Sequence, residues 1–370
     1  RPTQRIFNSL IHKHIKAEKP NAALEFYTLM QNMGLKGDAF TYSSLMNACY
    51  QVGRPDKALG FFEEMSKLGI EADEMVYSNL LTACIKANRP EEAIKYFEEM
   101  QQDSKLKMDS KILNIMLLVY SKEKSLMKSI KFGEEMIVSQ KIKPDTSTLN
   151  TMLSFYFKAN LPDKAFQLFQ DLKDQGVQPD IITFTCLLGG CVHASNGKFE
   201  EYFQEMNKRE IKPNQRTYNT IIHAFAQQGD VKNALKFLKI MEEQSSCDIF
   251  TYNCLLNAFK RSGDVNQAKY YYEELKRKKL TPDVVTFTSL LRVIFNHKNN
   301  NNITSPPDDS LTLSYVISEM KEREVIGNSH FCRVLEKLLR QGGHSETLTE
   351  YLQQHGVEKE DFQPRKKIKK

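Results

Sequence analysis

The segment TYNTIIHAFAQQGDVKNALKFLKIM, residues 217–241, returns as TYNCLLNAFKRSGDVNQAKYYYEEL at residues 251–275. Thr-Tyr-Asn, Ala-Phe, Gly-Asp-Val and a single Ala keep their places, whereas most other positions change. A recurrent Met or Leu extends this pattern over the chain, at Met30, Met65, Met100, Met136, Leu172, Met206, Met241, Leu275 and Met320. The spacing is 34 to 36 residues until the last interval of 45. Such a period indicates a repeat array in which each unit buries its apolar face against the next.

Each unit has the pattern of two helices. The second helix carries an apolar stripe such as Ala58, Phe61, Phe62 and Met65, whose spacing of i, i+3, i+4 and i+7 places them on one face. The corner between the helices is either a Pro, which suits the first turn of a helix, or a Gly-Asp pair that ends one helix and caps the next. We therefore expect an all-α fold, a right-handed α-solenoid superhelix of nine to ten helix-turn-helix repeats of about 35 residues.

The register divides the chain into nine units, a final hairpin and a tail. The units are residues 4–38, 39–73, 74–109, 110–145, 146–180, 181–214, 215–248, 249–283 and 284–328. NHKNNNNITSPPDDS, residues 296–310, lengthens the ninth unit, and we expect this polar insertion to loop out because it cannot bury apolar surface. Residues 329–356 resemble a degenerate capping hairpin, and residues 357–370 form a basic tail.

Most of the net positive charge of the chain lies at its C-terminus. The net charge is +6, and RKKIKK at residues 365–370 carries five of the cations, which leaves +1 for the rest. The tail is therefore read as a solvated end, a nuclear import signal or an arm on RNA. If the remaining chain binds RNA, its basic groups must gather on one face. No apolar run approaches the length of a membrane span, so we expect no membrane partner.

Two polar positions of the unit are restricted. The fifth residue is always Asn, Ser or Thr: Asn8, Ser43, Ser78, Asn114, Asn150, Thr185, Asn219, Asn253 and Thr288. The last residue is always Asp or Asn: Asp38, Asp73, Asp109, Asp145, Asp180, Asn214, Asp248, Asp283 and Asn328. The last residues could simply cap the next helix. However, Asn ends a unit only where Thr is fifth, which favours a paired role for the two positions.

These units resemble pentatricopeptide repeats over residues 4–328. The resemblance rests on the 35-residue period, Thr-Tyr-Asn or Thr-Phe-Thr in the first helix, Ala then Phe and Met in the second, and Pro-Asp at the end of units, as in Pro144-Asp145. The chain is similar to a P-type array without a catalytic C-terminal domain. Tetratricopeptide repeats have a similar period, but they usually carry a Trp, and this chain has none.

The resemblance implies that the array binds single-stranded RNA, with one base per unit read by the fifth and last residues. Asn with Asp favours U, Thr with Asn favours A, and Thr or Ser with Asp favours G. The expected target resembles 5′-UGGUUAUUA-3′. The second residues of the units would pack on base faces, at Phe40, Met75, Ile182, Phe250 and Val285. Cations at the end of the first helices would meet phosphates, at Lys16, Lys86, Lys122, Lys158 and Arg261.

Catalytic and metal-binding motifs are missing from the sequence. It has no C-x-x-C and no zinc-deaminase signature, and Cys49, Cys84 and Cys191 share one slot of their units, as packing residues would. We therefore expect a protein that is not an enzyme and needs no cofactor or metal.

Two functions of different classes remain from the sequence. The first is an organellar RNA-binding protein, mitochondrial or alternatively plastid by resemblance, that serves RNA stabilisation, processing or translation. The alternative is a structural component of a mitochondrial ribosome or similar assembly that contacts ribosomal RNA and proteins. A peptide-binding adaptor of the tetratricopeptide kind is the least favoured function.

Overall fold

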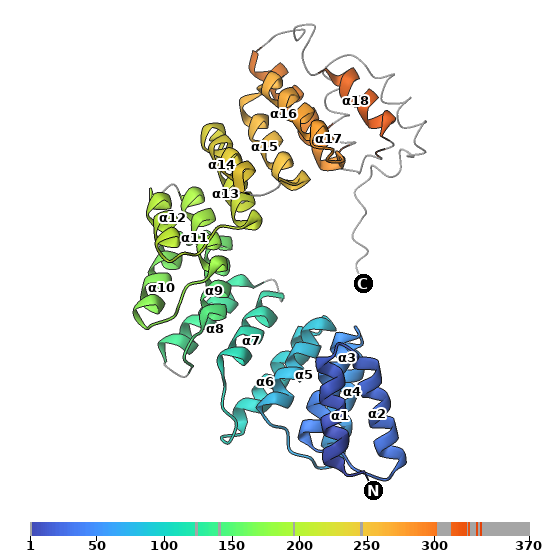
Figure 1. Cartoon of the computed structure of the whole chain (residues 1–370). Helices are drawn as coiled ribbons and strands as arrows, with labels where there is room; N and C mark the ends of the chain where they lie inside the picture. The colour runs from blue at the N-terminus through green and yellow to red at the C-terminus, as the bar shows by residue number, and fades with distance from the viewer. Residues whose placement is uncertain are drawn as a thin grey trace. The chain divides into compact units, whose positions relative to one another are not determined.

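Each unit of the sequence folds as a helical hairpin in the computed structural model (Figure 1). The structure describes residues 2–122, 125–139, 142–194, 197–244, 247–301 and 312–323, together with Val325, Phe331 and Val334. All regular structure in these residues is helical, in 18 helices, and the predicted all-α solenoid class is confirmed. None of the described helices is long and apolar enough to cross a membrane.

The first helix of every unit begins at the residue where the register starts that unit. These helices are α1 (Gln4–Lys16), α3 (Ala39–Gln51), α5 (Glu74–Lys86), α7 (Ser110–Lys122), α9 (Thr146–Lys158), α11 (Ile181–Ala194), α13 (Gln215–Gln228), α15 (Ile249–Ser262) and α17 (Val284–Asn301). The second helices are α2 (Pro20–Asn32), α4 (Pro55–Lys67), α6 (Pro90–Gln102), α8 (Leu126–Val138), α10 (Pro162–Asp174), α12 (Phe199–Lys208), α14 (Val231–Gln244), α16 (Val265–Arg277) and α18 (Leu313–Glu322).

The corners between paired helices use the two chemistries that the sequence predicts. Proline is the first residue of α2, α4, α6 and α10, where a missing N–H costs no helical hydrogen bond. Gly229 and Gly263 instead end α13 and α15 in the left-handed conformation, with φ of +80° and +67°. Asp264 then caps α16, because its side chain accepts from the backbone N–H of Gln267 at 3.0 Å.

Packing divides the chain into an N-terminal part, residues 1–179, and a C-terminal part, residues 180–370. Within each part, every first helix contacts its own second helix and the first helix of the next unit. The nine Met and Leu residues that mark the period are all buried, each at most 4% exposed. A first helix is thus covered on two sides, and the core continues from unit to unit.

The ninth unit departs from expectation at its insertion. Helix α17 continues to Asn301, so the prediction that the chain loops out from residue 296 is wrong for residues 296–301. Two contacts to the preceding unit hold the extension. Asn296 Nδ2 donates to the carbonyl of Lys260 at 2.7 Å, and His297 Nδ1 lies 2.9 Å from the carbonyl of Gly263. These contacts to the end of α15 outweigh the low helix propensity of the Asn-rich segment.

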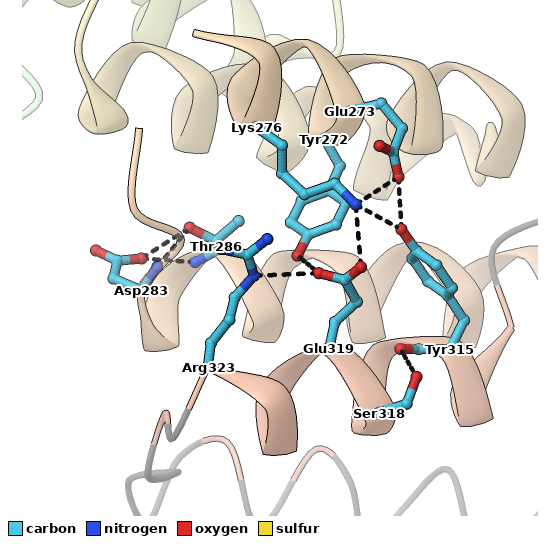
Figure 2. A network of polar contacts seen from close by, with 9 residues as sticks. All are labelled: Tyr272, Glu273, Lys276, Asp283, Thr286, Tyr315, Ser318, Glu319 and Arg323. Atoms are coloured by element: carbon cyan, nitrogen blue, oxygen red, sulfur yellow. Dashed lines mark hydrogen bonds and ion pairs between the residues drawn. The ribbon is translucent and has the colours of Figure 1, made fainter. Parts of the chain in front are cut away.

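Helix α18 is joined to α16 by a polar network (Figure 2). Glu319 accepts from Lys276 Nζ at 3.0 Å, from the Tyr272 hydroxyl at 2.8 Å and from Arg323 Nε at 3.1 Å. The Tyr315 hydroxyl donates to Glu273 at 2.5 Å. The network brings the end of the ninth unit onto the eighth. Residues 302–310 of the predicted loop, Asn328, most of the predicted hairpin 329–356 and the tail 357–370 lie outside the described residues.

Candidate nucleic-acid interface

The predicted packing positions expose large apolar side chains. Phe40 and Met75 in the N-terminal part, and Ile182, Phe250 and Val285 in the C-terminal part, are between 42% and 56% exposed. Single exposed apolar residues are common on protein surfaces. Here, however, they recur at the second residue of five units, at the start of the first helix. The recurrence gives each part a line of apolar contacts available to a ligand.

The last residue of each unit caps the following helix. In eight units its side-chain oxygen accepts the backbone N–H three residues later, at 2.8 to 2.9 Å. These residues are Asp38, Asp73, Asp109, Asp145, Asp180, Asn214, Asp248 and Asp283. The capping interpretation, which the sequence left open, is therefore confirmed for all of them. In the Asp caps, this role still leaves the second carboxylate oxygen available for other contacts.

Within the two parts of the described chain, the fifth and last residues meet in the units of Asn8, Asn114, Asn219 and Asn253. Asn8 Nδ2 donates to both carboxylate oxygens of Asp38, at 3.1 and 3.2 Å, and Asn253 Nδ2 donates to Asp283 at 3.1 Å. The same bond is 3.4 Å long in two further units, from Asn114 to Asp145 and from Asn219 to Asp248. The predicted pairs are thus physical pairs in these units. Asn150 and Asp180 fall in different parts, so each is placed only within its own part.

The two units with Ser at the fifth position differ from the Asn units in the hydrogen bonds of that residue. Ser43 and Ser78 are only 2% and 3% exposed, and neither bonds the last residue of its unit within the described chain. Asn79 Nδ2 donates to the Ser43 hydroxyl at 2.9 Å. The Ser78 hydroxyl has no hydrogen-bond partner among the described residues. The partners of the side chain, rather than burial, set the two predicted G-reading units apart from the Asn units, since Asn219 and Asn253 are buried too.

Thr185 contacts its cap, Asn214, indirectly. The Thr185 hydroxyl lies 2.8 Å from that of Thr217, which in turn donates to Asn214 at 3.0 Å. The Thr288 hydroxyl donates back to the carbonyl of Val284 at 2.6 Å, and its predicted partner Asn328 lies outside the described residues.

Our sequence reasoning missed the third residue of the unit. Six units have a fully buried Thr there: Thr41, Thr148, Thr183, Thr217, Thr251 and Thr286. The hydroxyl contacts the preceding cap, and at Thr41, Thr217, Thr251 and Thr286 it also reaches the fifth residue of the preceding unit. An Asp followed three residues later by Thr is a variant of the capping box, so the D-x-x-T spacing was the signal available. Thr217 and Thr251 are the first letters of the two repeated segments.

A hollow of about 510 Å³ joins these positions in the C-terminal part. Its lining includes Asn219 and Asp248, which form the predicted reading pair, and Arg216 and Phe250, the second residues of two successive units. Gln215 Nε2 donates to the second carboxylate oxygen of Asp248 at 2.7 Å. We call this hollow the slot. It combines a planar cation, an aromatic ring and a hydrogen-bonding pair.

The carboxylates of Asp38, Asp145 and Asp248 are held in the ionised form. Burial opposes ionisation of Asp248, but hydrogen bonds from Thr251, Asn219 and Gln215 outweigh it, and its pKa lies below the ordinary value. The pKa values of Asp38 and Asp145 are lowered in the same way, by their capping threonines and by Asn8 or by Ser110 and Asn114. An ionised carboxylate only accepts hydrogen bonds, so these positions favour a ligand that donates.

The predicted phosphate row is exposed but partly engaged within the protein. All five cations lie at the surface. Lys122 Nζ donates to the carbonyl of Ile85 at 2.7 Å, and Arg261 Nη1 donates to that of Gln227 at 2.8 Å. Lys86 lies above the Tyr50 ring, 5.8 Å from its centroid. A cation at the C-terminal end of the preceding first helix also favours the helix dipole. Three of the five cations therefore help to join consecutive units.

A larger hollow lies away from these residues. It measures about 1010 Å³ and is lined by residues of α8, α9, α10 and the turn between α8 and α9, among them Val138, Met152 and Leu168. None of the predicted site residues that the structure describes lines it. The smaller slot is the better candidate because its lining unites the three repeated positions.

The described part of the chain has no candidate metal site. It contains no group of three or more His, Cys, Asp or Glu residues placed to hold a metal ion. Burial raises the pKa of Cys49 to about 11 and those of Cys84 and Cys254 to about 12, so these thiols stay protonated at neutral pH. The packing role expected for Cys49 and Cys84 agrees with their complete burial.

Comparison with solved structures finds similar repeat proteins. The pentatricopeptide repeat protein PPR10 from maize is 21% identical, with 97% of this chain and 60% of that protein covered and a TM-score of 0.49. Its complex with an 18-nucleotide psaJ RNA element gives 20% identity, coverage of 96% and 64%, and a TM-score of 0.39. Nuclear proteinaceous RNase P 2 from A. thaliana is 17% identical, with coverage of 54% and 44% and a TM-score of 0.41.

Family models match along most of the array. The chain spans about 60% of the length of the maize protein, and none of the curated proteins matches it. Models of the PPR repeat family match residues 2–51, 144–193 and 247–296, and PPR repeat models match residues 40–70, 75–104 and 209–242. Together these matches cover more than half of the sequence. The chain therefore belongs to the pentatricopeptide repeat family.

Proposed function

We propose that this protein binds single-stranded RNA, one base per unit, along the second, fifth and last residues of its units. The observation that carries the proposal is the slot, where Arg216, Asn219, Asp248 and Phe250 meet. A nucleobase has a flat apolar face and a polar edge. Aromatic and guanidinium groups stack on such faces, and amide and carboxylate groups bond such edges. The slot offers both kinds of group within one hollow.

The proposed binding is not catalytic. We propose a role in RNA stabilisation, processing or translation, in the mitochondrion or alternatively the plastid, and an expected target resembling 5′-UGGUUAUUA-3′. The ionised caps support this preference in part, since Asp248 can accept a hydrogen bond from the N–H of a base. The organelle and the target follow from the family resemblance.

A second function is favoured by the cation row. Lys122 and Arg261 are hydrogen-bonded to the preceding unit, so the positive charge left to meet a phosphate chain is smaller than the sequence indicates. This arrangement fits a structural component of a ribosome-like assembly, whose RNA contacts would not depend on reading a sequence. The two functions differ in whether single bases matter.

Fluorescence anisotropy with labelled 5′-UGGUUAUUA-3′ and a shuffled RNA of the same composition separates them. Phe250→Ala should weaken binding of the expected target by about 5- to 150-fold, because stacking on an aromatic ring contributes about 1–3 kcal/mol per base. Tyr270→Ala is the matched control, since Tyr270 is an aromatic residue of α16 that is 53% exposed, against 51% for Phe250. Equal weak binding of both RNAs, abolished by salt and unaffected by Phe250→Ala, would refute base reading and leave the assembly component.

A further inference from the structure

The third residue of a unit varies together with the fifth residue of the unit before it. Wherever the fifth residue is Asn or Thr, the next unit has Thr third, and this holds at the six junctions that lead to Thr41, Thr148, Thr183, Thr217, Thr251 and Thr286. Ser43 and Ser78 are instead followed by Val76 and Ile112. All eight junctions obey the rule. The third residue is therefore matched to the fifth position across the junction.

Helix capping alone does not explain this match. Asp73 and Asp109 cap the N–H groups of Val76 and Ile112 at 2.8 Å, as short as the bonds to the threonines. The cap thus forms without a hydroxyl at the third position. The hydroxyl also bonds the side chain of the capping Asp, and beyond the cap its contact is with the fifth residue.

The contact fixes the orientation of an amide. Thr41, Thr251 and Thr286 each lie 2.6 to 2.8 Å from the Oδ1 atom of the Asn at the fifth position. The Nδ2 atom of the same Asn faces the cap carboxylate. A flipped amide would turn its oxygen toward that carboxylate, and two acceptors would then face each other. The Thr oxygen also accepts the N–H of the capping Asp, so the hydroxyl hydrogen is directed toward the side chains.

We infer that Thr41, Thr251 and Thr286 are positioning residues for base recognition, each of which fixes the donor and acceptor edges of the preceding Asn amide. The inference rests on the proposed function and deepens it. With Oδ1 held by Thr and one Nδ2 hydrogen held by Asp, the amide presents one remaining N–H and one remaining lone pair in a set order. A base with the complementary order binds, and a base with the reversed order does not.

The chain contains its own comparison at Asn114. This residue also precedes a Thr, Thr148, but its Oδ1 atom is buried without a hydrogen-bond partner in the described residues. The cap there, Asp145, accepts from the Ser110 hydroxyl at 2.7 Å in addition to its 3.4 Å bond from Asn114. The amide of Asn114 is therefore less fixed than those of Asn219 and Asn253. Discrimination should be weaker at the fourth nucleotide than at the seventh and eighth.

The test uses the full chain and RNAs that differ from 5′-UGGUUAUUA-3′ at a single nucleotide. A wrong base commonly costs about 1–3 kcal/mol, so the wild-type chain should prefer U to C at the seventh position by about fivefold or more. Thr251→Val keeps the shape of the side chain and removes the hydroxyl. It should reduce this preference to about twofold or less and leave the preference at the eighth nucleotide unchanged. Thr251→Ser keeps the hydroxyl and should keep the preference.

Thr286→Val is the reciprocal variant, and it should reduce the preference for U over C at the eighth nucleotide alone. A general loss of stability would weaken binding of all RNAs together and would leave the ratio of the affinities for U and C at each position unchanged. A change of this ratio at one position therefore distinguishes positioning from folding. A full preference at the seventh nucleotide in Thr251→Val would overturn the inference while the proposed function stands. A wild-type chain with no preference at either nucleotide would refute the proposed function itself.

Discussion

Replacing Glu319 with Ala should loosen α18 from the eighth unit. The carboxylate is the centre of the network in Figure 2, where Lys276, Tyr272 and Arg323 all donate to it. Its side chain is only 12% exposed, so little water replaces the lost bonds. Lys276 retains Glu273 at 2.9 Å and is not left without a counter-ion.

The magnitude follows from these contacts. A hydrogen bond to a charged group contributes about 1.5–3 kcal/mol, whereas breaking a fully buried ion pair costs about 3–5 kcal/mol. Because Lys276 keeps Glu273, we expect a local loss of about 2–3 kcal/mol. Amide hydrogen exchange in α18 should then accelerate by about 30- to 150-fold. Hydrogen exchange is the suitable assay because it reports the opening of single helices in a repeat array.

Glu322→Ala provides the control for this prediction. Glu322 is an exposed glutamate of the same helix, so its replacement changes the helix charge equally without touching the network. The amide exchange rates of α18 in Glu322→Ala should remain within about threefold of the wild-type values. Substitutions at the surface usually change the free energy of unfolding by no more than about 0.5 kcal/mol. Wild-type exchange in Glu319→Ala would show that the network does not hold α18.

Three further predictions concern the caps, the Gly turn and the thiols. Acid should destabilise the array below about pH 4. Because the folded state lowers the pKa of these caps below the ordinary value of 3.8, their ionisation stabilises the fold fully above that pH, and the stabilisation is lost as the pH falls through the folded-state pKa. Unfolding midpoints measured between pH 6 and pH 3 test this, and an unchanged midpoint would contradict it. The cap carboxylates concerned are Asp38, Asp145 and Asp248. Gly263→Ala should lower the free energy of unfolding by about 1–2 kcal/mol more than Gly53→Ala. Both residues have positive φ, but only the Cβ added at Gly263 would lie 3.1 Å from backbone atoms, those of His297. Equal losses of thermal stability in the two variants would contradict this. The buried thiols should resist alkylation at pH 8 until the chain is denatured, and rapid labelling of the native chain, followed by mass spectrometry, would contradict their raised pKa values. These thiols are Cys49, Cys84 and Cys254.

The fold could be predicted because its determinants are local and repeated nine times. The apolar stripe, the corner residues and the cap recur at fixed offsets, so even a weak signal in one unit becomes strong in the array. Each first helix begins where the register starts its unit. The start of the insertion was mispredicted because Asn is a poor helix former, and composition does not reveal the contacts of Asn296 and His297 with the preceding unit.

The candidate site was only partly predictable. Sequence spacing identified the paired positions, but it could not show that Ser43 and Ser78 are buried or that Asn79 bonds the Ser43 hydroxyl. These features depend on packing between units. Likewise, a row of cations in the sequence does not reveal that Arg261 donates to a carbonyl of the preceding unit. Which bases the site prefers stays a prediction.

The hydrogen bonds at the junctions also define what a duplication of this array would copy. Asn219 and Asp248 lie in residues 215–248, but the Thr251 that holds the amide belongs to the next unit. Duplicating one helical hairpin would therefore separate the Asn at its fifth position from the Thr that holds the amide. The Asn would instead face the third residue of its new neighbour, which is either Thr or an apolar residue. The segment that keeps a reading Asn, its cap and its supporting Thr together runs from the fifth residue of one hairpin to the third residue of the next. In this array, the module of recognition is offset from the module of folding.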